Sequence, residues 1–307
     1  MLNHINIPEF NSIINIDKLT YAANTNNIKV NDNINYIFYK IDIGDTSAVT
    51  EILKRHNVNY IINFAAETHV DNSILNPNVF IKTNVLGTAN LLTCAKQYWQ
   101  NDYKNKKFIQ ISTDEVYGSL SEESSSKFTE SSPLEPHSPY SASKTSADLI
   151  ALSYYYTYKF PVLITRCSNN YGPNQHKEKL IPLIIFNALN DFPIPIYGDG
   201  MNVRDWINVR DYCDAILNVL LNGRVGEVYN VGANTEKTNI EIANTILDYL
   251  NKPKALIQYV EDRLGHDRHY GVDASKIINE LGWQQTIPFE VGIINTIEYY
   301  KNIFNLN

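Results

Sequence analysis

Two short stretches of this chain carry side chains that could perform acid–base chemistry. Thr113-Asp114-Glu115 places a hydroxyl beside two adjacent carboxylates, and Tyr140 and Lys144 stand four residues apart. At that spacing on a helix both side chains lie on one face. A fixed ammonium beside a phenol favours the phenolate, so Tyr140 could take a proton from an alcohol near neutral pH. The two carboxylates could supply a second acid and a second base.

These residues need a strand and a helix to position them. The acidic triplet follows a run of β-branched and aromatic residues at 108–112, which predicts a buried strand, and the Tyr/Lys pair begins a helical pattern at 139–158. Further strands are predicted at 12–17, 36–41, 60–64 and 162–165, with helical patterns at 46–56 and 77–99. This alternation is typical of a parallel sheet with helices on both faces.

The rhythm of the chain changes after Asn170. The sequence predicts one helix and a short strand at 194–197 within 171–204, another helix and strand within 205–231, a helix at 239–251, a strand near 256–260 and short helices to the C-terminus. A polar Ser/Glu/Pro-rich loop is expected at 119–137. We therefore expect an α/β fold: a doubly wound, Rossmann-type parallel sheet with a smaller C-terminal lobe.

Polar or small residues follow several predicted strands where each strand ends, namely Asp17, Asp42, Ala65, Ala66, Thr113 and residues 167–169. Ligands of such sheets gather at the carboxyl ends of the strands. An aspartate there can accept hydrogen bonds from both hydroxyls of an adenosine ribose, although a strand-end Asp also forms turns.

Composition excludes several classes of function. A net charge of −7 with no basic cluster argues against nucleic-acid binding. The three cysteines are scattered without metal-like spacing, so we expect reduced thiols, a cytoplasmic protein and no bound metal. No apolar run approaches membrane-spanning length, so we expect no membrane association.

The ordered set of motifs resembles the extended short-chain dehydrogenase/reductase superfamily and, within it, the nucleotide-sugar 4,6-dehydratases of the dTDP-glucose type. The matching segments run in order along nearly the whole chain: 17–21, 65–71, 83–88, 112–118, 140–144, 166–173, 178–182 and 263–270. Epimerases of the superfamily share the Tyr/Lys pair but usually lack the Asp-Glu pair. The acid pair therefore favours a dehydratase, and residues 265–268 favour dTDP-glucose as substrate.

The resemblance implies a role for each matched residue. NAD would be bound by Asp17, Lys18, Leu19, Thr20, Asp42, Ile43, Phe64, Ala65, Ala66, Thr83, Tyr140, Lys144 and Asn170. The nucleotide sugar would be held by Thr68, Thr113, Asn169, Lys179, Leu180, Pro195, Tyr197, Arg204, Asn239, Arg263 and His266. For Leu180 and Pro195, ordinary packing is an equal alternative. Arg204 and Arg263 suit a diphosphate because a guanidinium fork binds two oxygens at once.

The resemblance also implies a division of the chain and of the chemistry. Residues 1–170 and 205–236 would bind NAD, residues 171–204 and 237–307 the nucleotide sugar, and the helices at 77–99 and 139–158 a second copy in a homodimer. The catalytic residues would be Thr113, Asp114, Glu115, Tyr140 and Lys144. Transient oxidation at C4 would be followed by loss of water across C5 and C6 and return of hydride to C6, a reaction of deoxysugar biosynthesis.

One family element is missing. The family opens with a strand and a Gly-x-x-Gly-x-x-Gly turn that lets the cofactor diphosphate approach a helix N-terminus, whereas this sequence has no glycine before Gly44. Residues 1–8 resemble the later part of the helix that follows this turn, so about 20 residues of a strand–turn–helix unit would be absent. The absent strand is a central one, and its loss would leave its neighbours unpaired.

Two explanations of this departure stay open, as do other functions. Either the start is an internal Met of a longer active protein, or the chain is a weakened or inactive relative that still binds a nucleotide sugar. Within enzymes, a UDP-sugar 4,6-dehydratase or an epimerase is the alternative. Outside them, the alternative is a non-catalytic binding protein on the same scaffold.

Overall fold

A computed structural model of the chain describes residues 10, 12–28, 35–121 and 127–304. The chain divides into two compact units, which are described separately. The first comprises Met1–Ser112, Ser138–Thr165 and Val219–Val228, and the second comprises Thr113–His137, Arg166–Asn218 and Tyr229–Asn307. In the described ranges, no helix combines the length and the apolar character needed to cross a membrane.

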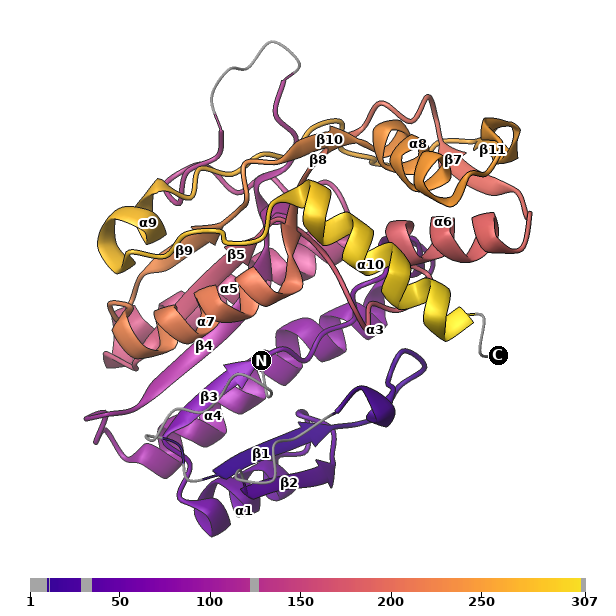
Figure 1. Cartoon of the computed structure of the whole chain (residues 1–307). Helices are drawn as coiled ribbons and strands as arrows, with labels where there is room; N and C mark the ends of the chain where they lie inside the picture. Colours follow the sequence, from indigo (N-terminus) through magenta and orange to yellow (C-terminus); the bar gives the residue numbers. More distant parts are fainter. Residues whose placement is uncertain (1–9, 11, 29–34, 122–126, 305–307) are drawn as a thin grey trace. The chain divides into compact units, whose positions relative to one another are not determined.

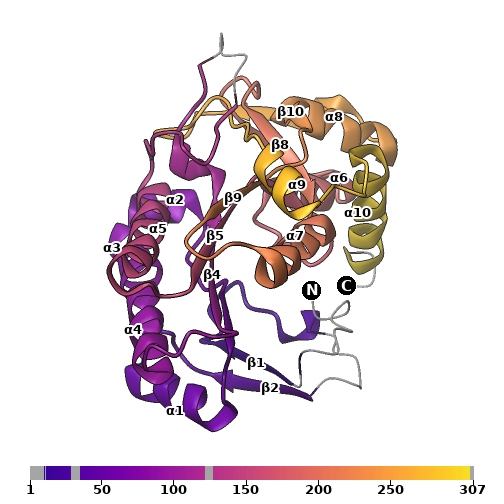
Figure 2. The same cartoon turned by 90° about the vertical axis from the view of Figure 1, so that its left-hand side faces the viewer.

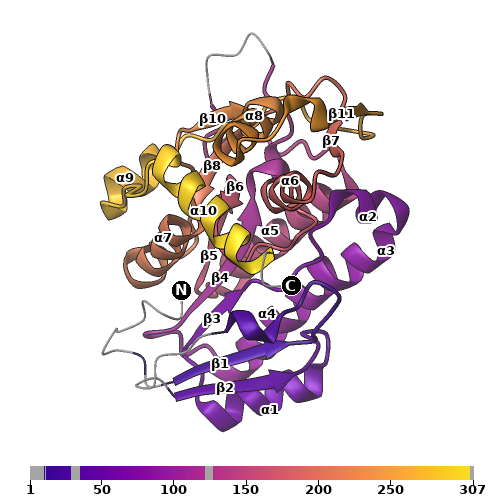
Figure 3. The same ribbon diagram turned by 45° about the vertical axis from the view of Figure 1, so that its right-hand side comes forward.

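The first unit is built on parallel strands. β1 (Ser12–Asp17) pairs with β2 (Asn35–Lys40), and β3 (Tyr60–Asn63) pairs with β4 (Lys107–Thr113), both in parallel. The second sheet has the order β3–β4–β5–β9, where β5 is Val162–Cys167 and β9 is Val228–Val231, and residues 166–167 and 229–231 of these strands belong to the second unit. The β1–β2 pair lies beside β3 (Figures 1 and 3). No described strand joins β1 to β3.

Helices cover one side of these strands (Figure 2). They are α1 (Thr46–His56), α2 (Val70–Leu75), α3 (Pro77–Phe80), the π-helix η3 (Ile81–Gly87), α4 (Thr88–Trp99) and α5 (Pro139–Tyr158). Local sequence sets the ends of α5. Ser138 and Ser141 form a capping box, Pro139 occupies the first turn, and Lys159 ends the helix in the left-handed conformation. The helices pack on a core that includes Trp99 stacked on Phe160, with ring centroids 5.2 Å apart.

The second unit combines short strands with three longer packed helices. β8 (Val203–Asn208) lies between β6 (Asn169–Tyr171) and β10 (Glu236–Thr238), while β7 (Ile194–Tyr197) pairs in parallel with β11 (Ile257–Val260). α6 (Leu180–Leu189) contacts both α8 (Asn239–Leu250) and α10 (Phe289–Phe304), and Figure 3 shows the three grouped together. Their apolar faces form one buried core with Trp206 of β8. The other described helices are η4 (Asp114–Tyr117), α7 (Val209–Asn222), η5 (Lys254–Leu256) and α9 (Ser275–Leu281), while η2 (Thr25–Asn27) belongs to the first unit.

The sequence predicts most of these elements. The structure confirms the strands at 12–17 and 194–197 and the helices at 46–56 and 139–158 with unchanged bounds. The helical pattern at 77–99 is real, but a π-helical turn interrupts it. The expectation of only short C-terminal helices is wrong, since α10 has 16 residues. The expected helix at 1–8 and part of the loop at 119–137 lie outside the described residues.

Candidate active site

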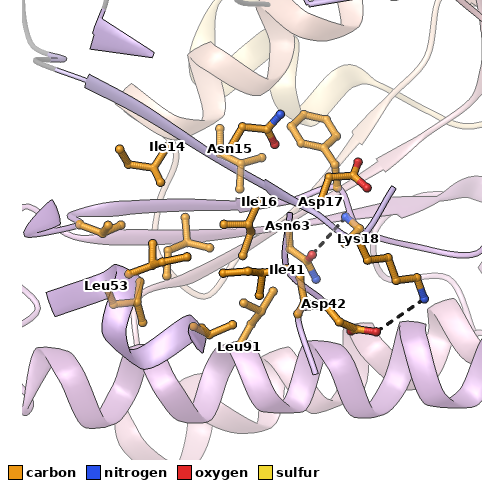
Figure 4. Close-up of a pocket in the computed structure, with 18 of the residues that line it drawn as sticks. Ile14, Asn15, Ile16, Asp17, Lys18, Ile41, Asp42, Leu53, Asn63 and Leu91 are labelled. Atoms are coloured by element: carbon orange, nitrogen blue, oxygen red, sulfur yellow. Dashed lines mark hydrogen bonds and ion pairs between the residues drawn. The ribbon is translucent and has the colours of Figure 1, made fainter. Parts of the chain in front are cut away.

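The first unit contains a cavity of about 740 Å³ that reaches the carboxyl ends of β1 and β3 (Figure 4). Most of the residues predicted to bind the cofactor line this one cavity: Asp17, Lys18, Thr20, Asp42, Ile43, Phe64, Ala65, Ala66 and Thr83. Leu19, Tyr140 and Lys144 are not among the described residues that line it. Asn170 belongs to the second unit. The structure thus gathers residues that are up to 66 positions apart in the sequence, from Asp17 at the end of β1 to Thr83 in η3.

A lysine and two aspartates form the polar end of the cavity. Asp17 Oδ1 accepts a hydrogen bond from the Leu19 N–H at 2.7 Å, and Leu19 has a positive φ of 55°. Asp17 is therefore a turn former, and its second oxygen leaves capacity for a ribose hydroxyl. Lys18 Nζ lies 3.2 Å from Thr83 Oγ1 and 3.9 Å from Asp42 Oδ2. This end can hold a polar, hydroxyl-rich group.

The buried side chain of Asn84 holds the loop after β3 in place. Its Oδ1 accepts from the Glu67 N–H at 2.8 Å, and its Nδ2 donates to the Glu67 carbonyl at 3.0 Å and to Ser143 Oγ at 2.8 Å. Asn84 lies in the π-helix η3 together with Thr83. Single π-helical turns often occur at functional sites. This one fastens the loop that carries Ala65 and Ala66 to helix α5.

Tyr140 and Lys144 both lie buried on α5, 8% and 5% exposed. The Tyr140 N–H donates to Ser73 Oγ at 3.1 Å, and the Tyr140 ring packs edge-on against Phe80. Lys144 Nζ donates to the Ile111 carbonyl at 2.5 Å. Burial lowers the pKa of Lys144 to about 8, although Asp148 acts against that change. The ammonium thus remains mostly charged at neutral pH and titrates just above it.

The acid pair lies in the second unit, on the 3₁₀ helix η4 that follows β4. Thr113 is the N-cap: its Oγ1 accepts from the Glu115 N–H at 3.3 Å and donates to Asp114 Oδ1 at 3.2 Å. Tyr117 anchors the other end of this helix. Its hydroxyl donates to Asn230 Oδ1 at 2.7 Å and accepts from Arg166 at 2.9 Å. Both ends of the short helix are therefore fixed, which sets the positions of Asp114 and Glu115.

The pKa values of Asp114 and Glu115 suit these two carboxyls to acid–base catalysis. Asp114 is 2% exposed, and burial, followed by the charge of Glu115, raises its pKa to about 8. Asp114 Oδ2 has no hydrogen-bond partner in the described part of the chain. Burial also raises the pKa of Glu115, while the positive charges of Arg204, Lys179 and Arg263 act against that rise. Asp114 accordingly keeps its proton at neutral pH and can act as an acid.

Arg204 is largely engaged by the protein itself. Its guanidinium donates to the carbonyls of Val203 at 2.7 Å and Asp267 at 2.9 Å, and stacks over the Tyr270 ring at 4.2 Å. These contacts fasten the segment that carries residues 263–270. Since a guanidinium has five N–H groups, the predicted diphosphate contact is still chemically possible.

Three residues predicted to hold the nucleotide sugar form a cluster. Arg263 lies over the Tyr197 ring at 5.0 Å, and His266 meets the same ring edge-on with centroids 6.1 Å apart. Asp262 Oδ1 lies 2.6 Å from His266 Nδ1 and orients the imidazole. A guanidinium backed by a phenol and an imidazole suits an anionic, hydroxylated ligand.

The other predicted substrate residues are more dispersed. Asn169 lies in β6, Lys179 caps α6, Leu180 begins α6 and packs on its core, Pro195 lies in β7, and Asn239 begins α8. Thr68 belongs to the first unit. Asn170 donates to Cys167 Sγ and to the Ser168 carbonyl, both at 3.2 Å, and its buried Oδ1 has no partner among the described residues. No role of these residues follows from position alone.

A carboxylate network beside the pair was not predicted. The buried Asp267 accepts from the Tyr270 hydroxyl at 2.5 Å and lies 2.5 Å from His137 Nδ1, and its charge contributes to the raised pKa of Glu115. Asp267 and Tyr270 fall inside the motif at 263–270, so the sequence held a signal for them. Asn84, which holds the β3 loop, likewise falls in the motif at 83–88.

A parallel sheet with carboxylates at its strand ends, a buried Tyr/Lys pair on one helix and an acid pair with a buried Asp114 define a dinucleotide-dependent enzyme of the extended short-chain dehydrogenase/reductase class. The chain belongs to the GDP-mannose 4,6 dehydratase family, whose model matches residues 6–296.

Curated and solved relatives agree with this membership. A dTDP-glucose 4,6-dehydratase of Xanthomonas campestris is 49% identical over 302 residues, which are 94% of this chain and 86% of the relative. A crystal structure of the dTDP-glucose 4,6-dehydratase of Streptomyces venezuelae with NAD bound is 43% identical, with a TM-score of 0.89, and the match covers 96% of this chain and 89% of that one. The Bacillus anthracis dTDP-glucose 4,6-dehydratase in complex with NAD is 49% identical, with a TM-score of 0.86 and coverage of 95% and 88%.

Proposed function

We propose that this protein converts dTDP-glucose into dTDP-4-keto-6-deoxyglucose with NAD⁺ as its cofactor. The observation that carries the proposal is the adjacent Asp114–Glu115 pair, in which Asp114 is buried and has a pKa of about 8. An epimerase needs only proton and hydride exchange at C4, whereas elimination of water also needs a base at C5 and an acid for the departing hydroxyl. Relatives 43–49% identical to this chain are named dTDP-glucose 4,6-dehydratases.

The cavity of the first unit fits the adenosine half of NAD. Asp17 and Asp42 offer carboxylate oxygens to hydroxyl and amino donors, while Ile43 and Phe64 offer apolar surface to a base. Burial leaves Ser112 Oγ without a partner in the described residues, beside the carbonyl that binds Lys144. These features fit a hydroxylated ligand, with Thr83, Tyr140 and Lys144 at its nicotinamide end. When bound, NAD⁺ supplies a hydride acceptor for C4 and a hydride donor for C6.

The residues of this chain move the protons. Tyr140, assisted by the Lys144 ammonium, takes the proton of the C4 hydroxyl. The C4 ketone makes the C5 hydrogen acidic, and Glu115 removes it as a base. Asp114, protonated at neutral pH, gives its proton to the C6 hydroxyl as it leaves as water. Thr113 Oγ1, bonded to Asp114 and to the Glu115 N–H, keeps the two carboxyls in place.

We propose that the nucleotide sugar is held by the residues predicted to bind it. Arg263, Arg204 and Lys179 would bind the diphosphate, because their positive charges act on Glu115, and Tyr197 and His266 would bind the neighbouring groups. Residues 1–170 and 205–236 would form the NAD-binding part, and residues 171–204 and 237–307 the nucleotide-sugar lobe. Thr68, Asn169, Leu180, Pro195 and Asn239 complete the proposed set of sugar-nucleotide contacts.

The proposal also includes the cellular location, the pathway and the oligomeric state of the protein. The protein would work in the cytoplasm, in deoxysugar biosynthesis, because its cysteines are unpaired thiols and two of the three are buried. It would form a homodimer through α3–α4 and α5, since Leu86 and Leu149 on this helical face are 61% and 54% exposed. A Leu149→Glu variant that stays dimeric in light scattering would exclude that face.

Product analysis tests the function. The purified chain, supplied with NAD⁺ and either dTDP-glucose or UDP-glucose, should release a 4-keto-6-deoxy product from the dTDP sugar. A 4-epimer would identify an epimerase, and preference for UDP-glucose would reassign the base. Binding of the dTDP sugar without any product, even with added NAD⁺, would identify the non-catalytic alternative.

A further inference from the structure

A loop at residues 172–179 joins β6 to α6 in the second unit and ends at Lys179, one of the residues proposed to bind the diphosphate. Its backbone departs from both elements, since Gly172 has a φ of 141° and Asn174 a φ of 66°. Such a loop needs hydrogen-bond partners elsewhere in the chain to keep one shape. The position of the Lys179 ammonium therefore depends on the contacts that fix this loop.

The C-terminal helix α10 supplies such contacts through two tyrosine hydroxyls. The Tyr300 hydroxyl donates to the Gln175 carbonyl at 2.7 Å and lies 3.3 Å from the Gly172 carbonyl. The Tyr299 hydroxyl donates to Asn174 Oδ1 at 2.5 Å. These contacts bind the backbone and one side chain of the loop to a helix at least 125 positions further along the chain.

The Tyr300 hydroxyl is itself well fixed. The side chain is 4% exposed, and its ring stacks on Phe304 with ring centroids 5.3 Å apart. Burial raises the pKa of Tyr300 above its ordinary value, so the hydroxyl keeps the proton that it donates. Gly292 lets the same helix approach β6, because a Cβ there would clash with the Tyr171 hydroxyl.

The loop also bears on the proposed base. Burial raises the pKa of Glu115, and the positive charge of Lys179 acts against that rise. Further ionisable groups whose charges act on Glu115, or respond to its charge, are Arg204 of β8, Arg263, Asp267 and Tyr270 of the 263–270 segment, and Asp114 of η4. A displaced loop would therefore change both the diphosphate contact of Lys179 and the electrostatic surroundings of Glu115.

We propose that Tyr300 is a positioning residue whose hydroxyl holds the 172–179 loop so that Lys179 binds the diphosphate of the nucleotide sugar, with Tyr299 as a second tie. This inference rests on the proposed function, because it takes the diphosphate role of Lys179 from there. Tyr300 acts through the Gln175 carbonyl and not on the reacting atoms. The C-terminal helix thus serves substrate binding as well as the packing of the second unit.

Binding of dTDP to the whole chain tests the role of Tyr300. Tyr300→Phe keeps the stacked ring and removes only the hydroxyl, so its Kd for dTDP in titration calorimetry should rise by about three- to tenfold. Tyr249→Phe is the matched control, because it also removes a hydroxyl that bonds to α10, at Glu298 Oε1, but leaves the loop contacts intact. Its Kd should equal that of the wild type. An unchanged Kd for Tyr300→Phe, or an equal rise in both variants, would overturn the proposal.

Two more measurements separate positioning from a general loss of packing. The Lys179 N–H donates to the His176 carbonyl at 3.0 Å, and hydrogen exchange of this amide should be faster in Tyr300→Phe than in Tyr249→Phe. With Lys179 displaced, the pKa of Glu115 rises, and a base acts only after losing its proton. The low-pH limb of C5 proton exchange should therefore move to higher pH in Tyr300→Phe alone. Wild-type behaviour in both measurements would contradict the proposal.

The outcome for the wild type distinguishes this inference from the proposed function. A wild type that binds dTDP but forms no 4-keto-6-deoxy product would remove the proposed function, while the comparison of Kd values and of hydrogen exchange would still decide the role of Tyr300. A wild type that does not bind dTDP would overturn the inference, because the loop would then have no diphosphate to meet.

Discussion

Replacing Asp114 by asparagine should make the folded protein more stable while removing most of its dehydratase activity. Asp114 is 2% exposed, and its pKa is about 8 against an ordinary value of 3.8. Below pH 3.8 Asp114 is protonated in both the folded and the unfolded chain, so its burial then carries no charge penalty. As the pH rises from 3.8 toward about 8, the unfolded chain releases the proton more readily than the folded chain, and the folded state loses stability. The loss is about 1.4 kcal/mol per pH unit, hence about 4 kcal/mol at pH 7. Asparagine has nearly the same shape and no charge, so its variant escapes this loss.

Urea unfolding followed by tryptophan fluorescence at pH 5, 6, 7 and 8 measures the effect. The free energy of unfolding of Asp114→Asn minus that of the wild type should grow by about 1.4 kcal/mol for each pH unit. Asp199 is the matched control, because Arg268 lowers its pKa to about 2 and it lies at the surface. The difference for Asp199→Asn should not grow over this range. A flat difference for Asp114→Asn would refute the raised pKa.

The dehydratase activity of Asp114→Asn should fall, although the stability of this variant rises. An amide cannot donate a proton to the leaving hydroxyl, so turnover of Asp114→Asn should fall by a factor of about 10² to 10⁴. The wild-type rate of water loss should decline above about pH 8, as Asp114 loses its proton. A variant that is both more stable and fully active would remove Asp114 from the role of acid.

Three further substitutions test neighbouring parts of the account. Glu115→Gln should retain oxidation at C4 but lose exchange of the C5 proton with solvent, and exchange at the wild-type rate in D₂O would exclude Glu115 as the base. Tyr117→Phe removes a buried hydroxyl with two hydrogen-bond partners and should cost about 1–3 kcal/mol in urea unfolding, whereas Tyr156→Phe, at a side chain 67% exposed, should stay within about 0.5 kcal/mol. Gly118→Ala should lower the free energy of unfolding more than Gly282→Ala in the same assay. Both glycines have positive φ, but an added Cβ at 118 would lie 2.4 Å from a backbone oxygen, whereas the space around 282 is open. Equal losses of stability would show that φ alone determines the cost.

The sequence was sufficient for the regular part of the fold. Apolar runs that end in Asp17 and Thr113 predict strands, and the Ser138-Pro139 start of α5 is a strong helix signal. β8 was missed because Arg204 and Asp205 interrupt its apolar pattern. Both charges are buried and have distant backbone partners: the Asp267 carbonyl for Arg204, in addition to that of Val203, and the N–H groups of Ala233 and Thr235 for Asp205. Such partners lie about 30 residues or more away, so no local pattern indicates them.

Motif matching proposes the residues of the candidate site, but the protonation states of these residues depend on tertiary structure. Motif matching named Asp114 and Glu115, and adjacency suggested that one carboxyl stays neutral. Only burial identifies Asp114 as a group that holds its proton to a pKa of about 8. Similarly, a diphosphate role for Arg204 follows from its type, whereas the structure places its guanidinium on the carbonyls of the 263–270 segment. Tertiary contacts decide both points.

One isotope measurement tests the central claim most directly. The chain is incubated in D₂O with NAD⁺ and dTDP-glucose that carries tritium at C4, and the product is analysed by position. Dehydration through transient oxidation predicts tritium at C6, solvent deuterium at C5 and a keto group at C4. Tritium that remains at C4, or a C4 epimer without deuterium at C5, would contradict it.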